Sequence, residues 1–302
     1  MPGSVPRPTP ADHGASASPL DRVLAARPPA FALLHRPEAT GPGVVELLLG
    51  EVSAPGALAD LPLADLPPAD LPPADAAAAD VPAAGAPSGG ERHELLVLVP
   101  YRQIAERGFE APDDGTPLLA LTVTDQSALP LDELLDRLPD GPVDLTGGAF
   151  DLGDEEYAQQ VRRVLAEEIG EGTGANFVLK RSFVAAVDGD ATTAALTLFR
   201  RLLQRETGAH WTFLVHTGER TLVGATPERH ISVHGGRAVM NPISGTYRYP
   251  EQGPELDGLL EFLGDRKETD ELYMVLDEEL KMMARICPGG GPAGVTTAGW
   301  SR

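Results

Sequence analysis

Short apolar runs separated by turn-forming dipeptides dominate the second half of the chain. The runs cover 211–215, 221–223, 231–233 and 237–240, and Thr217-Gly218 and Gly235-Gly236 each separate two of them. Such spacing is typical of antiparallel strands. Apolar residues at helical intervals predict amphipathic helices over 154–170, capped by Asp154, over 192–205 and over 267–286. The pattern predicts an α+β fold of largely antiparallel sheets with flanking helices.

The first half of the chain adds strands on both sides of a proline-rich segment. Apolar runs predict strands at 31–34, 44–49, 95–99 and 118–123, and another follows the first helix at 176–184. Residues 54–90 hold near repeats of Ala-Asp-Leu-Pro-Pro, which remove backbone donors and offer few large apolar groups. We expect a disordered insertion there, inside one domain, and a disordered leader over residues 1–20.

The chain carries a large acidic excess, with 45 acidic against 24 basic side chains and a formal net charge of -21. This charge would repel a phosphate backbone, so nucleic acid is not an expected partner. Cys287 is the only cysteine, which excludes an internal disulfide and fits a reducing, cytoplasmic location. No apolar run approaches the length of a bilayer span, so we expect no membrane association.

Two segments beyond residue 220 place a polar group beside a proline or glycine. In Gly224-Ala-Thr-Pro-Glu228 the proline fixes the chain direction and presents a carboxylate that could act as a general acid. A solvated loop glutamate is the commoner reading of that segment alone. In Asn241-Pro-Ile-Ser-Gly-Thr-Tyr-Arg248, Gly245 admits a ligand close to backbone donors, and Thr246 and Arg248 could hold a carboxylate. An ordinary turn accounts for this second segment about as well.

A third segment, Lys267-Glu-Thr-Asp-Glu-Leu272, places two carboxylates three residues apart. On a helix, Glu268 and Glu271 would project from one face, and like charges that close favour a divalent cation. Magnesium is usually held by one or two carboxylates together with substrate oxygens and water. Acidic residues at a helix start also complement the helix dipole, which is sufficient reason for the pair if it stood by itself.

Taken together, in order and spacing, the three segments resemble the chorismate-utilising enzymes, the family of anthranilate synthase component I, aminodeoxychorismate synthase, isochorismate synthase and salicylate synthase. The resemblance implies that family's fold, chorismate as substrate and magnesium as cofactor. It implies that Glu228 is the general acid for the departing ring hydroxyl. It further implies that Gly245 and Thr246 contact substrate, that Glu271 binds magnesium and that Glu268 lines the same site.

The segment around Asn176 discriminates among members of that family. Relatives that add water have a lysine base where Asn176 falls, whereas relatives that add ammonia have an uncharged side chain. Lys180 shares a strand face with Asn176 in ideal geometry, but it falls at a different family position. The amino-acid sequences of segments 99–110, 174–178 and 277–284 resemble those of the phenazine-pathway branch of the family, the 2-amino-2-deoxyisochorismate synthases. We therefore expect amination of chorismate with ammonia.

The resemblance stops near Ile286, which predicts a partial chorismate-binding domain over 21–288 and an unrelated tail over 289–302. Because a second magnesium glutamate and several core strands lie beyond this point in the family, we expect little or no activity from the chain as given. The resemblance also implies a glutamine amidotransferase domain or subunit as ammonia source and a homodimer when full length. No cysteine of this chain has the surroundings of the amidotransferase nucleophile.

Two alternatives stay open on the sequence. One is an anthranilate synthase large subunit, which would also eliminate pyruvate from chorismate. The other is a non-catalytic remnant with unpaired strand edges and exposed apolar surface. A water-adding isochorismate or salicylate synthase fits less well, because Asn176 supplies no base.

Overall fold

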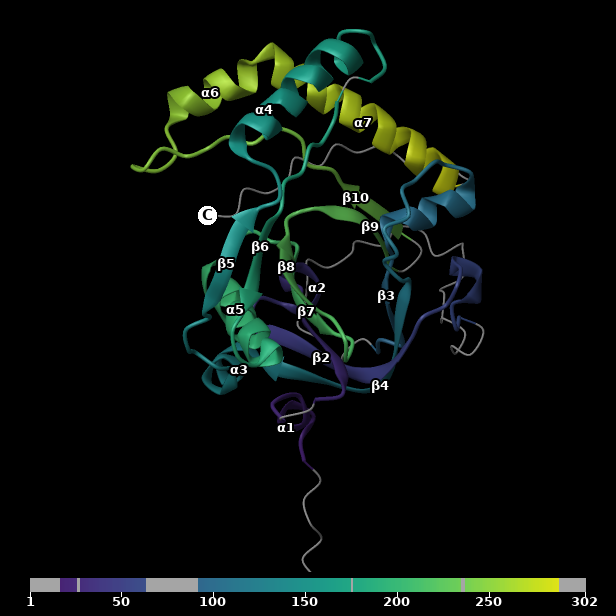
Figure 1. The fold of residues 1–302 in the computed structure, drawn as a ribbon, viewed down its shortest axis with the longest axis vertical. Helices are drawn as coiled ribbons and strands as arrows, with labels where there is room; N and C mark the ends of the chain where they lie inside the picture. Colours follow the sequence, from purple (N-terminus) through teal and green to yellow (C-terminus); the bar gives the residue numbers. More distant parts are fainter. Residues whose placement is uncertain (1–16, 26–27, 64–91, 175, 235–236, 288–302) are drawn as a thin grey trace, which may run out of the picture.

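The computed structural model describes residues 17–25, 28–63, 92–174, 176–234 and 237–287. Its main layer is a curved six-stranded sheet of order β3-β4-β2-β1-β7-β8, in which every neighbouring pair is antiparallel (Figure 1). The strands are β1 (Ala30–His35), β2 (Val44–Ser53), β3 (Leu95–Leu98), β4 (Leu119–Pro130), β7 (Trp211–His216) and β8 (Thr221–Thr226). The predicted α+β class with antiparallel sheets is confirmed.

Side-chain alternation along β1 gives the sheet two buried faces. Phe31 and Leu33 join one apolar cluster, and Ala32 and Leu34 join the other, because successive side chains of a strand point to opposite faces. The first cluster also packs against Phe199 of α5 (Ala191–Arg205) and against the short helices α1 (Pro19–Val23) and α3 (Leu131–Arg137). Full burial of a Leu or Phe side chain is worth about 1.5–3 kcal/mol, so these faces hold the sheet together.

The segment predicted as an insertion connects two strands of this sheet. Both β2 and β3 pair with β4, so the chain between them leaves and re-enters the same layer. Its first residues are described: Leu58–Asp60 form one turn of 3-10 helix, η1, and the Leu58 amide donates to the Glu106 carboxylate at 3.1 Å. Glu106 belongs to a second 3-10 helix, η2 (Tyr101–Arg107). Residues 64–91, the predicted leader up to residue 16 and the predicted tail lie outside the described residues.

A buried ion cluster closes the end of β1. The Arg36 Nε atom lies 2.6 Å from Glu46 Oε2, and His93 Nε2 lies 2.6 Å from Glu46 Oε1. The side chains of Arg36 and Glu46 are only 12% and 9% exposed. The Arg36 guanidinium also lies over the Trp211 ring, 5.4 Å from its centroid. Burial would raise the pKa of Glu46, but the hydrogen bonds from His93 and Arg36 outweigh it and lower the pKa to about 2.

Two further antiparallel pairs and three helices complete the structure. The pairs are β5 (Leu145–Phe150) with β6 (Phe183–Val187), and β9 (Arg229–His234) with β10 (Arg237–Asn241). The helices are α4 (Asp154–Arg163), α6 (Leu256–Gly264) and α7 (Arg266–Ile286), and all three lie at the top in Figure 1. A further short helix, α2 (Pro37–Thr40), links β1 to β2. The β9–β10 pairing supports the predicted hairpin, although its Gly-Gly turn lies outside the described residues.

Two local predictions are wrong. Residues 176–182 are not a strand, and β6 begins only at Phe183. The reason lies in side-chain contacts, since the Tyr157 hydroxyl donates to the Leu179 carbonyl and the Arg181 guanidinium stacks on Phe150 at 3.9 Å. Asp154 does not cap α4 either: Gly153 occupies the cap position, and Asp154 pairs with Arg181 at 2.8 Å. The helix runs on past Arg163 with π-helical winding over Val164–Ile169.

Within the described ranges, the structure contains no helix long and apolar enough to cross a membrane. The longest helix there, α7, carries charged side chains along its whole length.

Candidate active site

Glu228 lies in the two-residue link between β8 and β9, with its side chain exposed. The Glu228 amide donates to Thr226 Oγ1 at 3.2 Å, which holds the turn at Pro227. The next residue, Arg229, is 18% exposed and forms an ion pair with Glu38 of α2. This ion pair anchors the start of β9 to the main sheet. The link is therefore fixed on both sides of the predicted general acid.

Gly245 and Glu268 lie in direct contact, which joins two of the segments singled out in the sequence. A Cβ atom placed on Gly245 would collide with the Glu268 carboxylate and would lie 3.0 Å from Phe262 Cζ of α6. A side chain at this position would force the Glu268 carboxylate to move. The glycine therefore brings the backbone of the Gly-Thr segment against the predicted magnesium glutamates.

Tyr247 holds the Gly-Thr segment on α6. Its ring centroid lies 5.8 Å from that of Phe262, and a Cβ atom on Gly258 would lie 2.5 Å from the Tyr247 hydroxyl. Thr246 and Arg248, on either side of this tyrosine, are exposed. The predicted carboxylate-holding groups are therefore open to solvent, whereas the Tyr247 ring packs against α6.

Glu268 and Glu271 occupy the first turns of α7 and converge on one cation, Lys267. Lys267 Nζ lies 2.8 Å from Glu268 Oε1 and 3.6 Å from Glu271 Oε2. The hydrogen bond to Glu268, together with the charge of that glutamate, raises the pKa of Lys267. The expectation that the two carboxylates share a helix face is confirmed. Asp265 caps the helix by accepting the Glu268 amide at 3.1 Å.

The glutamate pair has the donor chemistry of a magnesium half-site. Its side chains are 23% and 27% exposed, so both oxygens can reach a ligand from solvent. Magnesium keeps several waters and needs only one or two protein carboxylates when substrate supplies further oxygens. In the described part of the chain, no group of three or more His, Cys, Asp or Glu side chains could hold a metal ion. The pair fits magnesium only with additional ligands.

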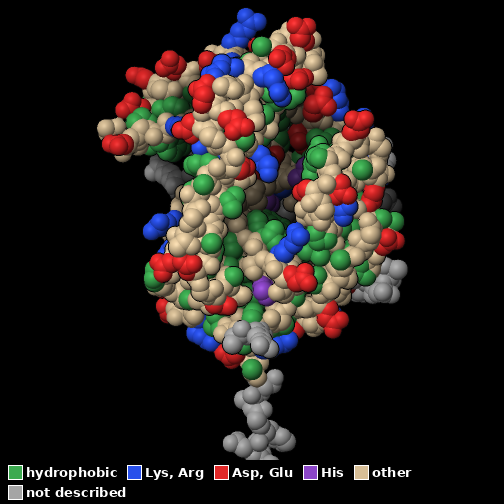
Figure 2. Space-filling model, viewed as in Figure 1, with side chains coloured by type: hydrophobic (Ala, Val, Ile, Leu, Met, Phe, Trp, Pro, Cys, Tyr) green, Lys and Arg blue, Asp and Glu red, His purple; other side chains and the backbone are tan. Residues whose placement is uncertain are grey.

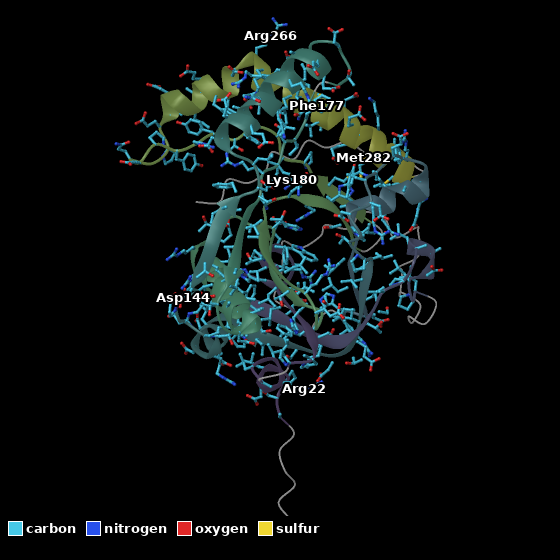
Figure 3. The ribbon with its side chains drawn as sticks, viewed as in Figure 1. Arg22, Asp144, Phe177, Lys180, Arg266 and Met282 are labelled. Carbon is cyan, nitrogen blue, oxygen red and sulfur yellow. The ribbon has the colours of Figure 1, made fainter. Side chains whose placement is uncertain are left out.

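Asn176 is exposed and lies in the irregular segment between the π-helical turn and β6. Figure 3 shows the labelled neighbours Phe177 and Lys180 on this segment, between α4 and the β5–β6 pair. Among the described residues, no hydrogen bond or ion pair connects Asn176 with Glu228, Gly245 or Glu271. The structure thus brings Gly245 together with Glu268 of α7.

One acidic residue near Glu228 has no counterpart in the sequence prediction. Glu279 lies two turns beyond Glu271 on α7, and the charges of Glu228 and His230 both act on it. Burial raises the pKa of Glu279, the charge of His230 lowers it, and the charge of Glu228 raises it. In the sequence Glu279 stands in Asp-Glu-Glu, a run that reads as a solvated helix face. Only the helical register, by which Glu279 returns to the face of Glu268, could have singled it out.

The face between the upper helices and the sheet is hollowed, with hydrophobic side chains inside the hollow and both basic and acidic ones around it (Figure 2). A separate shallow cavity of about 540 Å³ lies between α1, α3 and the start of α5. Residues lining it include Val23, Arg137, Asp190 and Thr193, and none of the predicted site residues does so. That cavity belongs to the packing of the main sheet and not to the candidate site.

Comparison with known proteins identifies the family. The family model described as "chorismate binding enzyme" matches residues 132–292, a range that contains every predicted site residue. The chain is 53% identical over 272 residues to "Anthranilate synthase, phenazine specific" of Pseudomonas chlororaphis, a match that covers 90% of this chain and 40% of that relative. It is likewise 53% identical over 277 residues to the Pseudomonas fluorescens protein of the same name, with 92% and 40% covered.

A more distant relative is "Anthranilate synthase component 1" of Thermococcus kodakarensis, 32% identical over 184 residues, with 60% of this chain and 38% of that protein covered. The chain thus spans about 40% of the length of the curated relatives that it matches. The family model covers more than half of the chain. The chain belongs to the family of chorismate binding enzymes.

Proposed function

We propose that this chain forms part of an enzyme that aminates chorismate with ammonia to give 2-amino-2-deoxyisochorismate, as in phenazine-type biosynthesis. The contact between Gly245 and Glu268 carries the proposal. It sets backbone donors of the Gly-Thr segment beside two convergent carboxylates. That is the arrangement needed to hold a carboxylate of the substrate next to a cation. The names of the two Pseudomonas relatives, both phenazine specific, support this branch of the family.

In the proposed reaction Glu271 and Glu268 would hold magnesium, which would replace Lys267 as their positively charged partner. Magnesium would neutralise the ring carboxylate of chorismate and orient the ring. Gly245 and Thr246 contact the substrate, and Arg248 supplies a positive charge for its second carboxylate. These roles use the chain's own donors to overcome an acidic background of net charge -21.

The proposed reaction forms one carbon–nitrogen bond and breaks one carbon–oxygen bond of the ring. The ammonia nitrogen bonds to the ring carbon next to the one that carries the carboxylate, the ring double bonds shift, and the C–O bond of the ring hydroxyl breaks elsewhere on the ring. Glu228 donates a proton so that the hydroxyl leaves as water, and the new amine releases one proton to solvent. Asn176 is a neutral amide that cannot deprotonate water, whereas ammonia is nucleophilic without a base. A glutamine amidotransferase domain or subunit is the proposed source of ammonia. The proposed location is a reducing cytoplasm, and the full-length protein is proposed to be a homodimer.

Calorimetric titration of chorismate into the 302-residue chain tests this proposal. With magnesium present, we expect binding that weakens at least about tenfold in Glu271→Gln, because the variant removes one charged ligand. Glu278→Gln is the matched control, since Glu278 lies on the same helix but pairs with Lys281 at 2.7 Å. Chorismate binding that is absent, or that ignores both magnesium and Glu271→Gln, would refute the proposal.

The alternative function is that of an anthranilate synthase large subunit, favoured by the relatives named "Anthranilate synthase component 1". Incubation of a full-length version of the protein with chorismate, ammonium and magnesium separates the two reactions. Anthranilate fluorescence without an added lyase would support the alternative. A non-fluorescent aminated product that retains its enolpyruvyl group would support 2-amino-2-deoxyisochorismate. A non-catalytic role is supported if chorismate binds and neither product forms.

A further inference from the structure

The link that carries Glu228 is held on both sides by contacts that meet at Glu38 of α2. After the link, Arg229 forms an ion pair with the Glu38 carboxylate. Before the link, the Thr226 carbonyl accepts a hydrogen bond of 2.7 Å from the His210 amide. The Nδ1 atom of the same histidine lies 3.7 Å from Glu38 Oε2. One carboxylate on the connection between β1 and β2 therefore contacts the residues that fix both ends of the link.

The Arg229 side chain depends on this carboxylate. It is only 18% exposed, whereas the Glu38 side chain is 58% exposed. The Arg229 Nε atom is buried and has no hydrogen-bond partner within the described residues. A mostly buried guanidinium that lost its carboxylate would carry an uncompensated charge and would shift toward water. Because Arg229 is the first residue of β9 and directly follows Glu228, such a shift would move the backbone of Glu228.

His210 fills space beside Glu38 without adding charge. Its side chain is 14% exposed. Burial first, and the charge of Arg36 second, lower the pKa of the His210 ring, so the ring is neutral near pH 7. At that pH the positive charge that the Glu38 carboxylate receives across this contact comes from Arg229 and not from His210.

We propose that Glu38 is a positioning residue for Glu228 and that it acts through Arg229. The inference rests on the proposed function, in which Glu228 is the general acid. A general acid must lie within about 2.6–3.2 Å of the oxygen that receives its proton, and a misplacement of about 1 Å can lower the rate about a hundredfold. The Glu228 side chain is exposed, so the backbone of the link, and not side-chain packing, decides where this carboxyl lies.

Hydrogen exchange followed by NMR tests the positioning in the 302-residue chain, without substrate. In Glu38→Gln the amides of Glu228 and His210 should exchange about fivefold faster, because the ion pair no longer holds the link. Arg229→Gln should give the same increase, and the double variant should give no further increase, since both changes remove one interaction. The control Asp125→Asn removes an ion pair of β4 and should leave both amides unchanged.

Steady-state kinetics of a full-length version of the protein, with chorismate, ammonium and magnesium, test the consequence for catalysis. Glu38→Gln should lower kcat about tenfold to a hundredfold and leave KM for chorismate within about twofold, since Glu38 does not touch substrate in the proposed site. The decline of kcat toward alkaline pH, which reports loss of the proton from the general acid, should flatten in this variant. A smaller amount of folded protein could not produce that flattening.

Unchanged exchange of the two amides in Glu38→Gln would overturn the proposal, and so would an equal increase in Asp125→Asn. An additive effect in the double variant, or an unchanged kcat and pH profile, would overturn it as well. Failure of the unaltered full-length protein to aminate chorismate would instead refute the proposed function. The exchange measurement needs no chorismate, so it would still decide whether Glu38 holds Glu228 in place.

Discussion

Glu46→Gln measures what the buried ion cluster of Arg36, Glu46 and His93 contributes to stability. Depression of the Glu46 pKa from 4.5 to about 2 corresponds to about 3 kcal/mol, at about 1.4 kcal/mol per pH unit. The folded pKa lies below the unfolded one, so this stabilisation is complete above pH 4.5 and is lost as the pH falls toward 2. Removing one partner of a buried ion pair typically costs about 3–5 kcal/mol, which agrees in size.

Urea denaturation followed by circular dichroism checks this value in the unaltered chain and in the variant. At pH 7 we expect the free energy of unfolding of Glu46→Gln to be lower by about 3 kcal/mol, and the difference to shrink below about pH 4.5. Glu51→Gln, an exposed position on the same strand, should change it by less than about 0.5 kcal/mol. A difference under about 1 kcal/mol at pH 7, or one independent of pH, would refute the reasoning.

Three further substitutions test the site, the core and the surface. Gly245→Ala should weaken magnesium-dependent chorismate binding in calorimetry, because its methyl group would force the Glu268 carboxylate to move, whereas Gly264→Ala, which meets nothing within 4 Å, should leave it intact. Equal binding by both variants would contradict this contact. Leu33→Ala, at a fully buried position, should cost about 2–5 kcal/mol in urea denaturation, and Leu222→Ala, 39% exposed, less than about 1 kcal/mol. Val184→Ser, at a residue 62% exposed on β6, should reduce binding of a hydrophobic dye, and undiminished fluorescence would argue against apolar exposure there.

The main sheet was predictable because its strands are continuous apolar runs. Leu47, Leu48 and Leu49 are all buried, and such runs are typical of strands covered on both faces. The β5–β6 pair was not predictable in the same way. Its first strand contains two adjacent glycines, Gly147 and Gly148, and all six of its residues are exposed. This strand depends on its pairing with β6, and no pattern in its own sequence predicts a strand.

The α6 helix was missed for a related reason. Gly258 lies inside this helix, and a glycine destabilises a helix by about 1 kcal/mol relative to an alanine. The local sequence therefore does not favour a helix there. In the structure this glycine leaves room for the Tyr247 hydroxyl, which a Cβ atom there would crowd. Requirements of this kind depend on a residue that is eleven positions away in the chain.

Some features of the candidate site could likewise be predicted from local sequence, and others could not. Glu268 and Glu271 were recognisable because three-residue spacing on a helix sets two side chains on one face. The approach of Gly245 to Glu268 was implied only by the family resemblance. The anchoring of Glu228 through Arg229 to Glu38 joins residues 191 positions apart. Such long-range contacts arise from the folded sheet, so no local pattern could reveal them.

The placement of the proline-rich segment has a practical consequence for protein engineering. Because β2 and β3 both pair with β4, the register of the sheet is set by β4 and not by the length of the chain that joins β2 to β3. For a flexible connection, each doubling of length costs only about 0.6 kcal/mol of closure entropy. A fluorescent reporter or an affinity tag inserted between β2 and β3 should therefore leave the pairing of both strands with β4 intact, which makes this connection a convenient place to label the protein.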